Sequence, residues 1–542
     1  MAKRILFLVV FQVAIVSLGF GQKIDLNSKL SKRQMYKDFD EFVQIVDSNT
    51  QSLVRKIATG YDAADEIRQR RGEIKKINSH GKFIYFLNDC LALTMAQHAQ
   101  MAENCRFGYG RNYIDTQIVK PLYDAYIDYL PNLPRVVNLM TGFYYKGGYY
   151  ASMKQVFINM DTQDTTILTN FRVLKHNDEP VGKLKNNLIK DRATWYRWDY
   201  ELQQYYPVYG AHYIPRTDKI VAEDYPSKKI IELDMKNCRR ILCDALPDSV
   251  INTLPKNEES DKMKITYYDS LHLLYIYMGS MTEDDGVFAD SIKKIGKGKQ
   301  IDKIIWDVRG NGGGSDAAWR DVLCAIIKEP LYVKGWISFR NTEKIRRIVK
   351  DNMESNVEDA IKSSIKNYIE NSMGENPLPQ EFLKHKIPFL DSAEFLTMVD
   401  GIENGDTVKY VPDTNSLRYE GKIYILQNKF VYSSTGTLLA NAQLYPQLVT
   451  VGEPTGLIRG RGISPFIFQL PESKYTFLLD ACVDLTNCET AIDVFHDRPK
   501  IEIYPTLEEM IEMNNYGNYL NKRGDEFLFK HDYLFKKVLE ME

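Results

Sequence analysis

A glycine-rich turn directly after an apolar strand-like segment is the first feature of this sequence that could do chemistry. Residues 304–315 read Ile-Ile-Trp-Asp-Val-Arg-Gly-Asn-Gly-Gly-Gly-Ser. Backbone N–H groups of such a loop can approach a developing negative charge, because glycine has no Cβ to obstruct them. The nucleotide-binding frames G-x-x-x-x-G-K-S/T and G-x-G-x-x-G both fail here. An oxyanion-stabilising loop is therefore favoured, with a purely structural turn as the alternative.

A second turn places two serines at the start of a predicted helix. Residues 422–436 run from the strand-like Lys-Ile-Tyr-Ile-Leu-Gln through Asn-Lys-Phe-Val-Tyr to Ser-Ser-Thr-Gly. The positive end of a helix dipole and its unpaired N–H groups favour an alkoxide and an oxyanion at this point. Ser433 is therefore a candidate nucleophile, while the alternative is that Ser433 or Ser434 only caps the helix.

A third block, Val-Gly-Glu-Pro-Thr-Gly at 451–456, follows the candidate serine at a fixed distance along the chain. The blocks D-V-R-G-N-G-G-G, strand-turn-serine-helix and V-G-E-P-T-G, in this order, resemble the tail-specific, C-terminal-processing family of serine peptidases. The resemblance extends over residues 264–506 and implies that Ser433 is the nucleophile.

The resemblance implies an α/β fold with a crotonase-like spiral core of ββα units. It implies a serine endopeptidase that hydrolyses flexible or C-terminal protein segments through an acyl-enzyme on Ser433. Backbone groups of Gly312, Gly313 and Ser434 would hold the oxyanion. The implied partner is a protein or peptide substrate, with no cofactor and no metal. The alternative is a catalytically inactive peptide- or ligand-binding protein on the same scaffold.

A serine hydroxyl needs a base, and two branches of the family supply one differently. One branch uses a lysine shortly after G-E-P-T, but this chain has Ile458 at that place. The other branch, of tricorn-type and retinoid-binding-type relatives, uses a histidine from an N-terminal helical segment. His98 in Leu-Ala-Leu-Thr-Met-Ala-Gln-His-Ala (91–99) lies where those relatives carry it, so this chain is closer to the second branch and His98 is the expected base.

The acid that orients the base is expected in Ala-Ile-Asp-Val-Phe-His-Asp-Arg-Pro, residues 491–499. The resemblance favours Asp493, with Asp497 as the alternate. His496 in the same segment could itself be the base if His98 is not. The sequence leaves these alternatives open, since only geometry ranks the members of a triad.

The chain is long enough for several domains, because domains commonly have about 100 to 200 residues. The segment 171–181 looks like part of a PDZ-like domain, which would hold an extended peptide by strand addition. The predicted division is a signal peptide (1–21), a helical N-terminal domain (22–114), a β-rich PDZ-like domain (115–262), a peptidase core (263–510) with an inserted helical subdomain (340–415), and a helical C-terminal tail (511–542).

Charge and the N-terminal residues bear on partners and location. The formal net charge of −2 argues against a nucleic-acid partner. Lys3 and Arg4 precede an apolar run that ends on small residues, which predicts a signal peptide cleaved near Gly21. The protein is therefore expected to be exported, either periplasmic or secreted, without stable membrane insertion after cleavage. An uncleaved membrane anchor is the alternative, and the sequence does not predict the oligomeric state.

Seven cysteines lack the spacing of a zinc site, so neither a structural metal nor a cysteine nucleophile is expected. A local disulfide such as Cys482 with Cys488 is compatible with an exported protein.

Overall fold

The computed structural model describes most of the chain. The described residues are 24–96, 98–103, 115–129, 142–151, 153–180, 195–199, 204–208, 219–254, 262–332, 335–340, 342, 395–400, 402–403, 406–407, 409–455, 466–480, 482–495, 498–517 and 519–542. The predicted signal peptide therefore lies outside the described residues.

The N-terminal part is helical, as predicted. Its helices are α2 (Lys32–Asp47), α3 (Thr50–Thr59), α4 (Ala63–Gln69), α5 (His80–Ala92) and α6 (Thr116–Tyr129), with a 3-10 helix at Arg70–Lys76. Ser31 and Gln34 form the capping box that opens α2, which the Ser-Lys-Arg-Gln sequence encodes. Helix α6 shares the hydrophobic core of the earlier helices through Leu122 and Tyr126.

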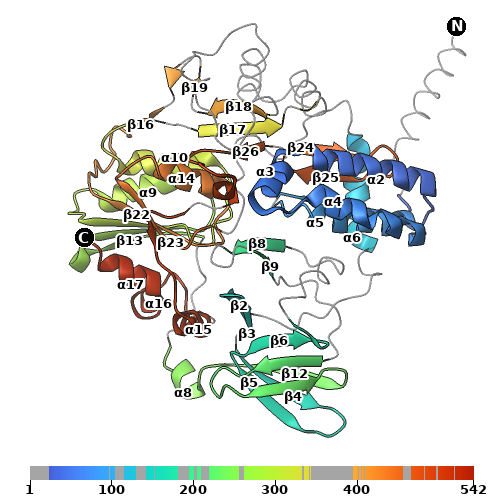
Figure 1. The fold of residues 1–542 in the computed structure, drawn as a ribbon. Coiled ribbons are helices and arrows are strands. Elements are labelled where there is room, and N and C mark those ends of the chain that lie inside the picture. Colours follow the sequence, from blue (N-terminus) through green and yellow to red (C-terminus); the bar gives the residue numbers. More distant parts are fainter. Residues whose placement is uncertain are drawn as a thin grey trace, which may run out of the picture.

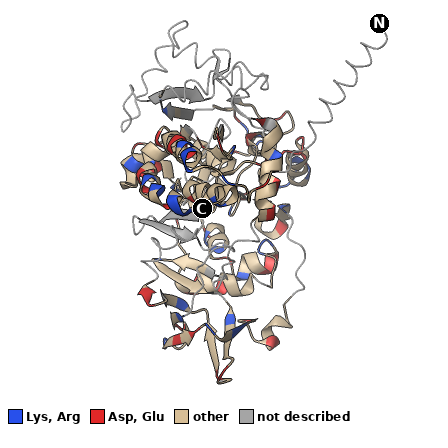
Figure 2. Cartoon of the chain, turned by 90° about the vertical axis from the view of Figure 1, so that its right-hand side faces the viewer, with Lys and Arg blue, Asp and Glu red and all other residues tan. Residues whose placement is uncertain are grey.

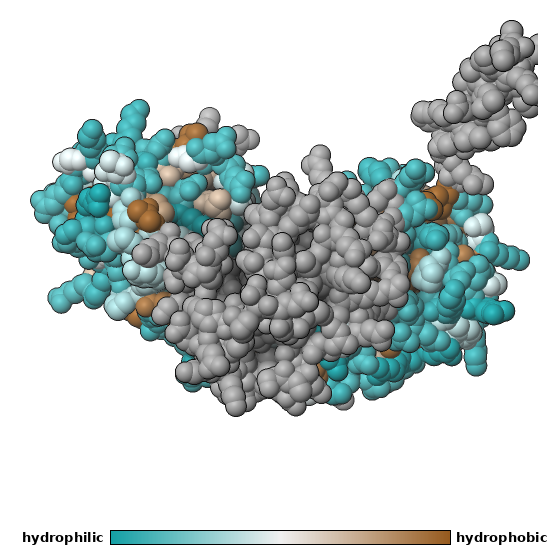
Figure 3. All heavy atoms as spheres, turned by 90° about the horizontal axis from the view of Figure 1, so that it is seen from above, coloured by the Kyte–Doolittle hydropathy of each residue, from teal (hydrophilic) through white to brown (hydrophobic). Residues whose placement is uncertain are grey.

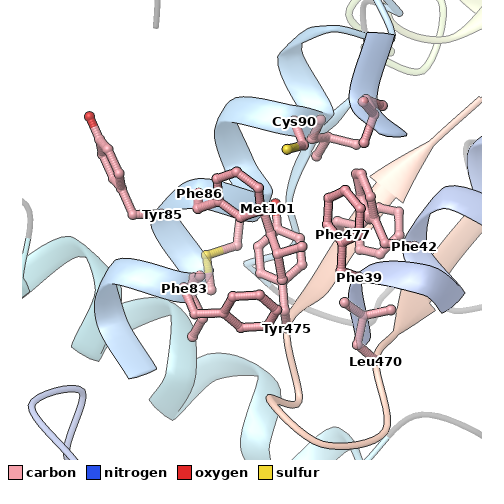
Figure 4. Close-up of a cluster of buried hydrophobic side chains, with 14 of the residues drawn as sticks. Phe39, Phe42, Phe83, Tyr85, Phe86, Cys90, Met101, Leu470, Tyr475 and Phe477 are labelled. Carbon is pink, nitrogen blue, oxygen red and sulfur yellow. The ribbon is translucent and has the colours of Figure 1, made fainter. Parts of the chain in front are cut away.

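A hairpin from late in the chain packs on these helices. Strands β24 (Phe466–Gln469) and β25 (Thr476–Leu479) pair antiparallel, and the short strand β1 (Gln100–Met101) adds to β25. Figure 4 shows Tyr475 and Phe477 of this hairpin among the phenylalanines of α2 and α5. The buried aromatic cluster thereby ties residues near 100 to residues near 480.

The central sheet has six strands in the order β13-β14-β15-β22-β23-β27, and all neighbours are parallel except β13 and β14. The strands are β13 (Met263–Tyr268), β14 (Leu273–Met278), β15 (Lys303–Asp307), β22 (Ile423–Gln427), β23 (Leu448–Gly452) and β27 (Ile501–Glu502). Buried β15 and β22 carry apolar side chains on both faces, as strands of a covered parallel sheet do.

Helices cover both faces of this sheet (Figure 1). One face packs on residues of α9 (Val287–Gly296), α10 (Asp316–Ile326) and α14 (Ser434–Ala442). The other face packs on the C-terminal helices α16 (Asp525–Lys530) and α17 (Tyr533–Leu539), which follow α15 (Leu507–Tyr516). The α/β class with a helical N-terminal part and sheet-rich parts is thus confirmed.

The middle of the chain is rich in strands, as predicted. One sheet has the order β11-β10-β6-β3-β2 with β7 beside β6, another has the order β12-β4-β5, and β8 pairs with β9. The elements are β2 (Gly142–Tyr145), β3 (Gly148–Ala151), β4 (Lys154–Asn159), β5 (Thr165–Thr169), β6 (Arg172–His176), β7 (Glu179–Pro180), β8 (Trp195–Asp199), β9 (Gln204–Val208), β10 (Lys219–Glu223), β11 (Ile230–Asp234), β12 (Cys238–Cys243) and α8 (Asp248–Ile251).

Short strands make up much of the described part of the predicted insertion at 340–415. They are β18 (Phe395–Asp400), β19 (Ile402–Glu403), β20 (Asp406–Thr407) and β21 (Lys409–Tyr410), and most of the charged, helix-favouring stretch lies outside the described residues. Strand β18 pairs with β17 (Gly335–Arg340), which also pairs with β26 (Cys482–Asp484), while β21 pairs with β16 (Leu331–Tyr332).

The surface carries mixed charge and scattered apolar residues. Figure 2 shows basic and acidic residues beside one another on the helices, and Figure 3 shows isolated hydrophobic residues among hydrophilic ones on the face it presents. Among the helices of the described ranges, none combines the length and apolar character needed to cross a bilayer.

Candidate active site

The carboxyl ends of two adjacent parallel strands carry the two predicted turns. Strand β15 leads into the glycine loop, and its neighbour β22 leads into the serine turn. Tyr432 N–H donates to the carbonyl oxygen of Asn311 at 3.1 Å, which fastens the two turns together. The side chain of Asn311 is fully buried, accepts from Gly313 N–H at 2.8 Å and donates to Met278 O at 2.8 Å. The asparagine of the D-x-R-G-N block therefore shapes the loop.

Ser433 has a strained backbone. It precedes α14 with φ of 57° and ψ of −128°, and its side chain makes no capping hydrogen bond to that helix. A non-glycine residue in this region costs about 1–3 kcal/mol, and such strain often marks functional sites. The alternative interpretation, in which this serine is a simple N-cap, does not agree with this geometry.

The glycine loop lies against the serine turn at Gly313. A Cβ atom on Gly313 would lie 2.6 Å from Ser433 Cβ, 2.8 Å from Tyr432 O and 3.0 Å from Ser434 N, and φ of this glycine is 101°. Both the close approach and the positive φ require glycine at this position. The structure thus brings Ser433, Ser434 and Gly313 together.

The N–H group of Gly313 is not available to an oxyanion in this structure, because it donates to Asn311 Oδ1. This corrects one of the three predicted donors: Gly313 contributes a missing Cβ, not a free N–H. The backbone N–H groups of Gly312 and Ser434 find no acceptor among the described residues. Ser434 is the first residue of α14, where the helix leaves its N–H groups unpaired.

His98 lies beside a carboxylate, which is Asp480 rather than Asp493. His98 Nδ1 lies 2.5 Å from Asp480 Oδ1, and the side chain of Asp480 is only 6% exposed. The phenol of Tyr432 joins them, with its oxygen 3.1 Å from His98 Nδ1 and 3.3 Å from Asp480 Oδ2. A histidine–carboxylate pair is thus in contact with the residue that precedes Ser433.

Long-range strand pairing assembles this pair. Helix α5 ends at Ala92, so His98 lies in the loop before β1 and not on the predicted helix. Strand β1 pairs with β25, and Ala102 N–H donates to Thr476 O at 2.8 Å, so residues before β1 meet residues after β25. Asp480 directly follows β25, and Asn49 Nδ2 donates to its backbone carbonyl.

The electrostatics of the pair suit a general base. Burial alone would lower the pKa of His98, but the charge of Asp480 and its hydrogen bond raise it above the ordinary histidine value. Burial alone would raise the pKa of Asp480, but His98 holds it below the ordinary aspartate value. The carboxylate therefore stays ionised beside the imidazole.

The predicted orienting acid lies in a different environment. Asp493 is in the 3-10 helix Ala491–Phe495, and its Oδ2 accepts from the N–H groups of Glu489 and Thr490 and from Thr490 Oγ1. This carboxylate stabilises its own turn, as acidic residues commonly do in turns. The two alternates, His496 and Asp497, lie outside the described residues, and so does Ile458.

A buried ion network behind the glycine loop was not predicted from the sequence. Arg309 donates to both oxygens of Asp307 and to both oxygens of Asp532, at 2.7 to 2.9 Å. Burial would raise the pKa of Asp307, but Arg309 and Arg523 hold it at about 2. Asp532 also accepts from the N–H groups of Leu534 and Phe535 and so caps α17. The C-terminal helices are thereby tied to the loop.

The glycine of the third block allows a close backbone contact. A Cβ on Gly452 would lie 2.2 Å from the carbonyl oxygen of Gln427, and φ of Gly452 is 129°. Gln427 Nε2 donates to Glu453 O at 3.0 Å. In the described residues this block therefore fixes the end of β22, where the serine turn begins.

Comparisons with known proteins agree with the three sequence blocks. The sequence model of peptidase family S41 matches residues 272–478. No curated protein matches the chain. Within the described ranges, no three His, Cys, Asp or Glu residues are grouped as a metal site.

Two solved structures of CPAF share the fold at low sequence identity. The structure of mature CPAF has a TM-score of 0.51 at 12% identity, over 90% of this chain and 95% of that one. The structure of mature CPAF complexed with lactacystin has a TM-score of 0.50 at 11% identity, over 94% and 98%. The photosystem II D1 C-terminal processing protease has a TM-score of 0.35 at 10% identity, over 90% and 98%.

The family match covers the glycine loop, the strained serine and the V-G-E-P-T-G block. It identifies residues 272–478 as a domain of peptidase family S41, which confirms the predicted resemblance to the tail-specific peptidases and the predicted enzyme class, a serine-type peptidase.

Proposed function

We propose that this protein is an exported serine endopeptidase that cleaves flexible or C-terminal segments of proteins through an acyl-enzyme on Ser433. One observation carries the proposal: the strained Ser433 lies against Gly313 at the start of α14, and the Tyr432 ring beside it contacts a histidine–carboxylate pair. A nucleophile, a base and an orienting acid are the parts that acyl transfer requires.

In the proposed mechanism, His98 Nε2 takes the proton from Ser433 Oγ as this oxygen attacks a peptide carbonyl. Asp480 accepts a hydrogen bond from His98 Nδ1–H, which holds the imidazole in the tautomer with a free Nε2 lone pair, and the carboxylate stabilises the imidazolium that forms. His98 then protonates the leaving amine, and water hydrolyses the acyl-enzyme by the reverse proton transfers.

The N–H groups of Gly312 and Ser434 are the proposed oxyanion donors. Both lack an acceptor in the described structure, and Ser434 N–H lies at the positive end of α14. Losing one such donor costs on the order of 3 kcal/mol of transition-state stabilisation. An extended substrate would reach this site as a strand, and the exposed edge strand β11 of the middle sheet could hold it by strand addition.

Cleavage of an unfolded protein tests the activity. Purified protein is incubated with a reduced, denatured protein and with the same protein folded, and new termini are identified by mass spectrometry. Wild type should cut the unfolded substrate. Ser433→Ala should not, whereas Ser291→Ala, which changes a half-buried serine on α9 whose hydroxyl donates to Val287 O of its own helix, should match wild type. Equal cleavage by Ser433→Ala would contradict the proposal.

The exported location rests on the basic and apolar residues at positions 3–20. Expression of the full sequence followed by N-terminal sequencing of the accumulated protein tests it. A mature chain that begins near Gln22, recovered outside the cytoplasm, agrees with the proposal; an intact N-terminus on cytoplasmic protein contradicts it.

A further inference from the structure

The phenol of Tyr432 lies between the two members of the proposed His98–Asp480 pair. Its oxygen is within hydrogen-bond distance of His98 Nδ1 and of Asp480 Oδ2, while Asp480 Oδ1 is bonded to His98 Nδ1. The Tyr432 and His98 rings are 5.0 Å apart between centroids, at an angle of 47°. Three side chains from three separate segments thus form one closed cluster.

The protonation states of the three side chains decide which group donates the hydrogen bond between Tyr432 and the His98–Asp480 pair. An ionised carboxylate only accepts hydrogen bonds, and a histidine that serves as base through Nε2 carries its proton on Nδ1. Nδ1–H then donates to Asp480 Oδ1 and has no lone pair for the phenol proton. The Tyr432 hydroxyl therefore donates to Asp480 Oδ2, and each carboxylate oxygen receives one hydrogen bond.

Tyr432 also joins the parts of the chain that supply the site. Its backbone N–H is held by Asn311 O in the glycine loop, and the next residue is Ser433. His98 and Asp480 instead come from the loop before β1 and from the end of β25, which belong to the sheet packed on the N-terminal helices. Through its phenol, Tyr432 brings the serine turn into contact with the histidine–carboxylate pair.

We propose that Tyr432 is a positioning residue of this site: its hydroxyl fixes the Asp480 carboxylate and the His98 imidazole relative to Ser433. This rests on the proposed function in naming His98 as the base. The hydrogen bond from Tyr432 also draws charge away from Asp480, so it limits how strongly this carboxylate raises the basicity of His98.

Within the described ranges, two further side chains that act on Asp480 are the neutral amides of Asn49 and Gln51. Asn49 donates to the backbone carbonyl of Asp480, and the Gln51 amide favours the charged form of the Asp480 carboxylate. Asp480 is the one charged group that acts on the pKa of His98 among the described residues. A shift in the titration of His98 on removing the phenol oxygen can therefore be assigned to this hydrogen bond.

The first test is kinetic and uses Tyr432→Phe, which keeps the ring and removes only the hydroxyl. We expect kcat/KM for a peptide substrate to fall about tenfold with little change in KM, because the lost bond is to a charged group. Tyr424→Phe is the matched control, since its hydroxyl donates to the backbone carbonyl of Glu542 at the far end of β22. Equal activity of Tyr432→Phe and wild type overturns the proposal.

The second test does not need catalysis. The eight histidines are labelled with 13C at Cε1, the signal of His98 is assigned with His98→Gln, and its titration is followed by NMR in wild type and Tyr432→Phe. We expect the pKa of His98 to rise by about half a unit in Tyr432→Phe, because Asp480 keeps its full charge. An unchanged or lower pKa overturns the assignment of the phenol as donor to Asp480.

The two tests separate this inference from the proposed function. If wild type neither cleaves nor reacts, the proposed function fails, and the titration still decides whether Tyr432 donates to Asp480. If wild type cleaves but Tyr432→Phe changes neither kcat/KM nor the titration, the positioning role fails and the peptidase remains.

Discussion

Adding one methyl group at Gly313 should inactivate the site while the same change at its neighbour should not. In Gly313→Ala the new Cβ would lie 2.6 Å from Ser433 Cβ and 2.8 Å from Tyr432 O. Real Cβ contacts are not this short, and a backbone atom cannot move aside as a flexible side chain can. The serine turn must therefore shift away from the loop.

The size of the effect follows from this displacement and from the backbone conformation. Alanine at φ of 101° adds strain of about 1–3 kcal/mol to the folded state. A misplacement of about 1 Å costs on the order of 10²-fold in rate, and loss of an oxyanion donor costs about 10²- to 10³-fold. We therefore expect kcat/KM to fall by about 10²- to 10³-fold.

Gly312→Ala is the matched control. A Cβ on Gly312 meets no atom within 4 Å, and alanine retains the N–H that we propose as a donor. Its unfolding free energy should stay within about 0.5 kcal/mol of wild type and its kcat/KM near the wild-type value. Peptide hydrolysis and thermal unfolding are measured for the three proteins. Full activity of Gly313→Ala, or equal loss in both variants, would refute the reasoning.

Three further predictions follow from the pair and the ion network. Activity should rise with pH through an apparent pKa above the ordinary histidine value of about 6.5. The reason is that the base must be neutral and that Asp480 raises the pKa of His98 by more than burial lowers it. The pH profile of kcat/KM measures this apparent pKa. Asp480→Asn should lower kcat on the order of 10²- to 10⁴-fold, whereas Asp493→Asn should only weaken a turn, by about 1 kcal/mol of unfolding free energy. Asp532→Ala should lower the unfolding free energy by about 3–5 kcal/mol in denaturant titration, because it removes both a buried ion pair with Arg309 and the cap of α17. Asp532→Asn keeps the cap and should therefore lose less unfolding free energy.

Each of these has a contradicting outcome. An acidic limb at or below the ordinary histidine pKa would show that Asp480 does not act on the base. Equal losses of activity in Asp480→Asn and Asp493→Asn would place the orienting acid elsewhere. A wild-type unfolding free energy in Asp532→Ala would show that the buried network contributes nothing to the fold.

Much of the core could be predicted because its signals are local. The strand-like run at 422–427 is found as β22, and the helix predicted to start at the two serines is found as α14, which begins at Ser434. An apolar run that ends on glycine or serine marks both the end of a buried strand and the turn that follows it. The same residues fix the contact between Gly313 and Ser433.

The acid partner could not be predicted in the same way. His98 and Asp480 are 382 residues apart, and their contact depends on β1 pairing with β25 and on the aromatic cluster beneath that hairpin. Asp493 looked suitable because it lies in the segment where relatives carry an acid, but its own turn holds it. One signal was available: Asp480 lies within the otherwise uncharged run 475–481, Tyr-Thr-Phe-Leu-Leu-Asp-Ala, where a charged residue is unusual.

The Arg309 network was also out of reach of local patterns. In the sequence Arg309 is only one member of the D-x-R-G-N motif, but in the structure it binds Asp532, 223 residues away, at the start of α17. A charged residue at the edge of a buried strand requires a partner, since an isolated buried charge is costly. The sequence indicates that need and does not indicate which carboxylate meets it.

The measurement that tests the central claim most directly is covalent labelling by a fluorophosphonate, with the modified residue located by mass spectrometry. Wild type, Ser433→Ala, Ser434→Ala and His98→Gln are compared at matched concentration. The account predicts a phosphonyl group on Ser433 of wild type and no labelling of Ser433→Ala. Labelling should be retained in Ser434→Ala, because alanine keeps the backbone N–H, and it should be strongly slowed in His98→Gln. Labelling that persists in Ser433→Ala, or a folded wild type that never reacts, would contradict it.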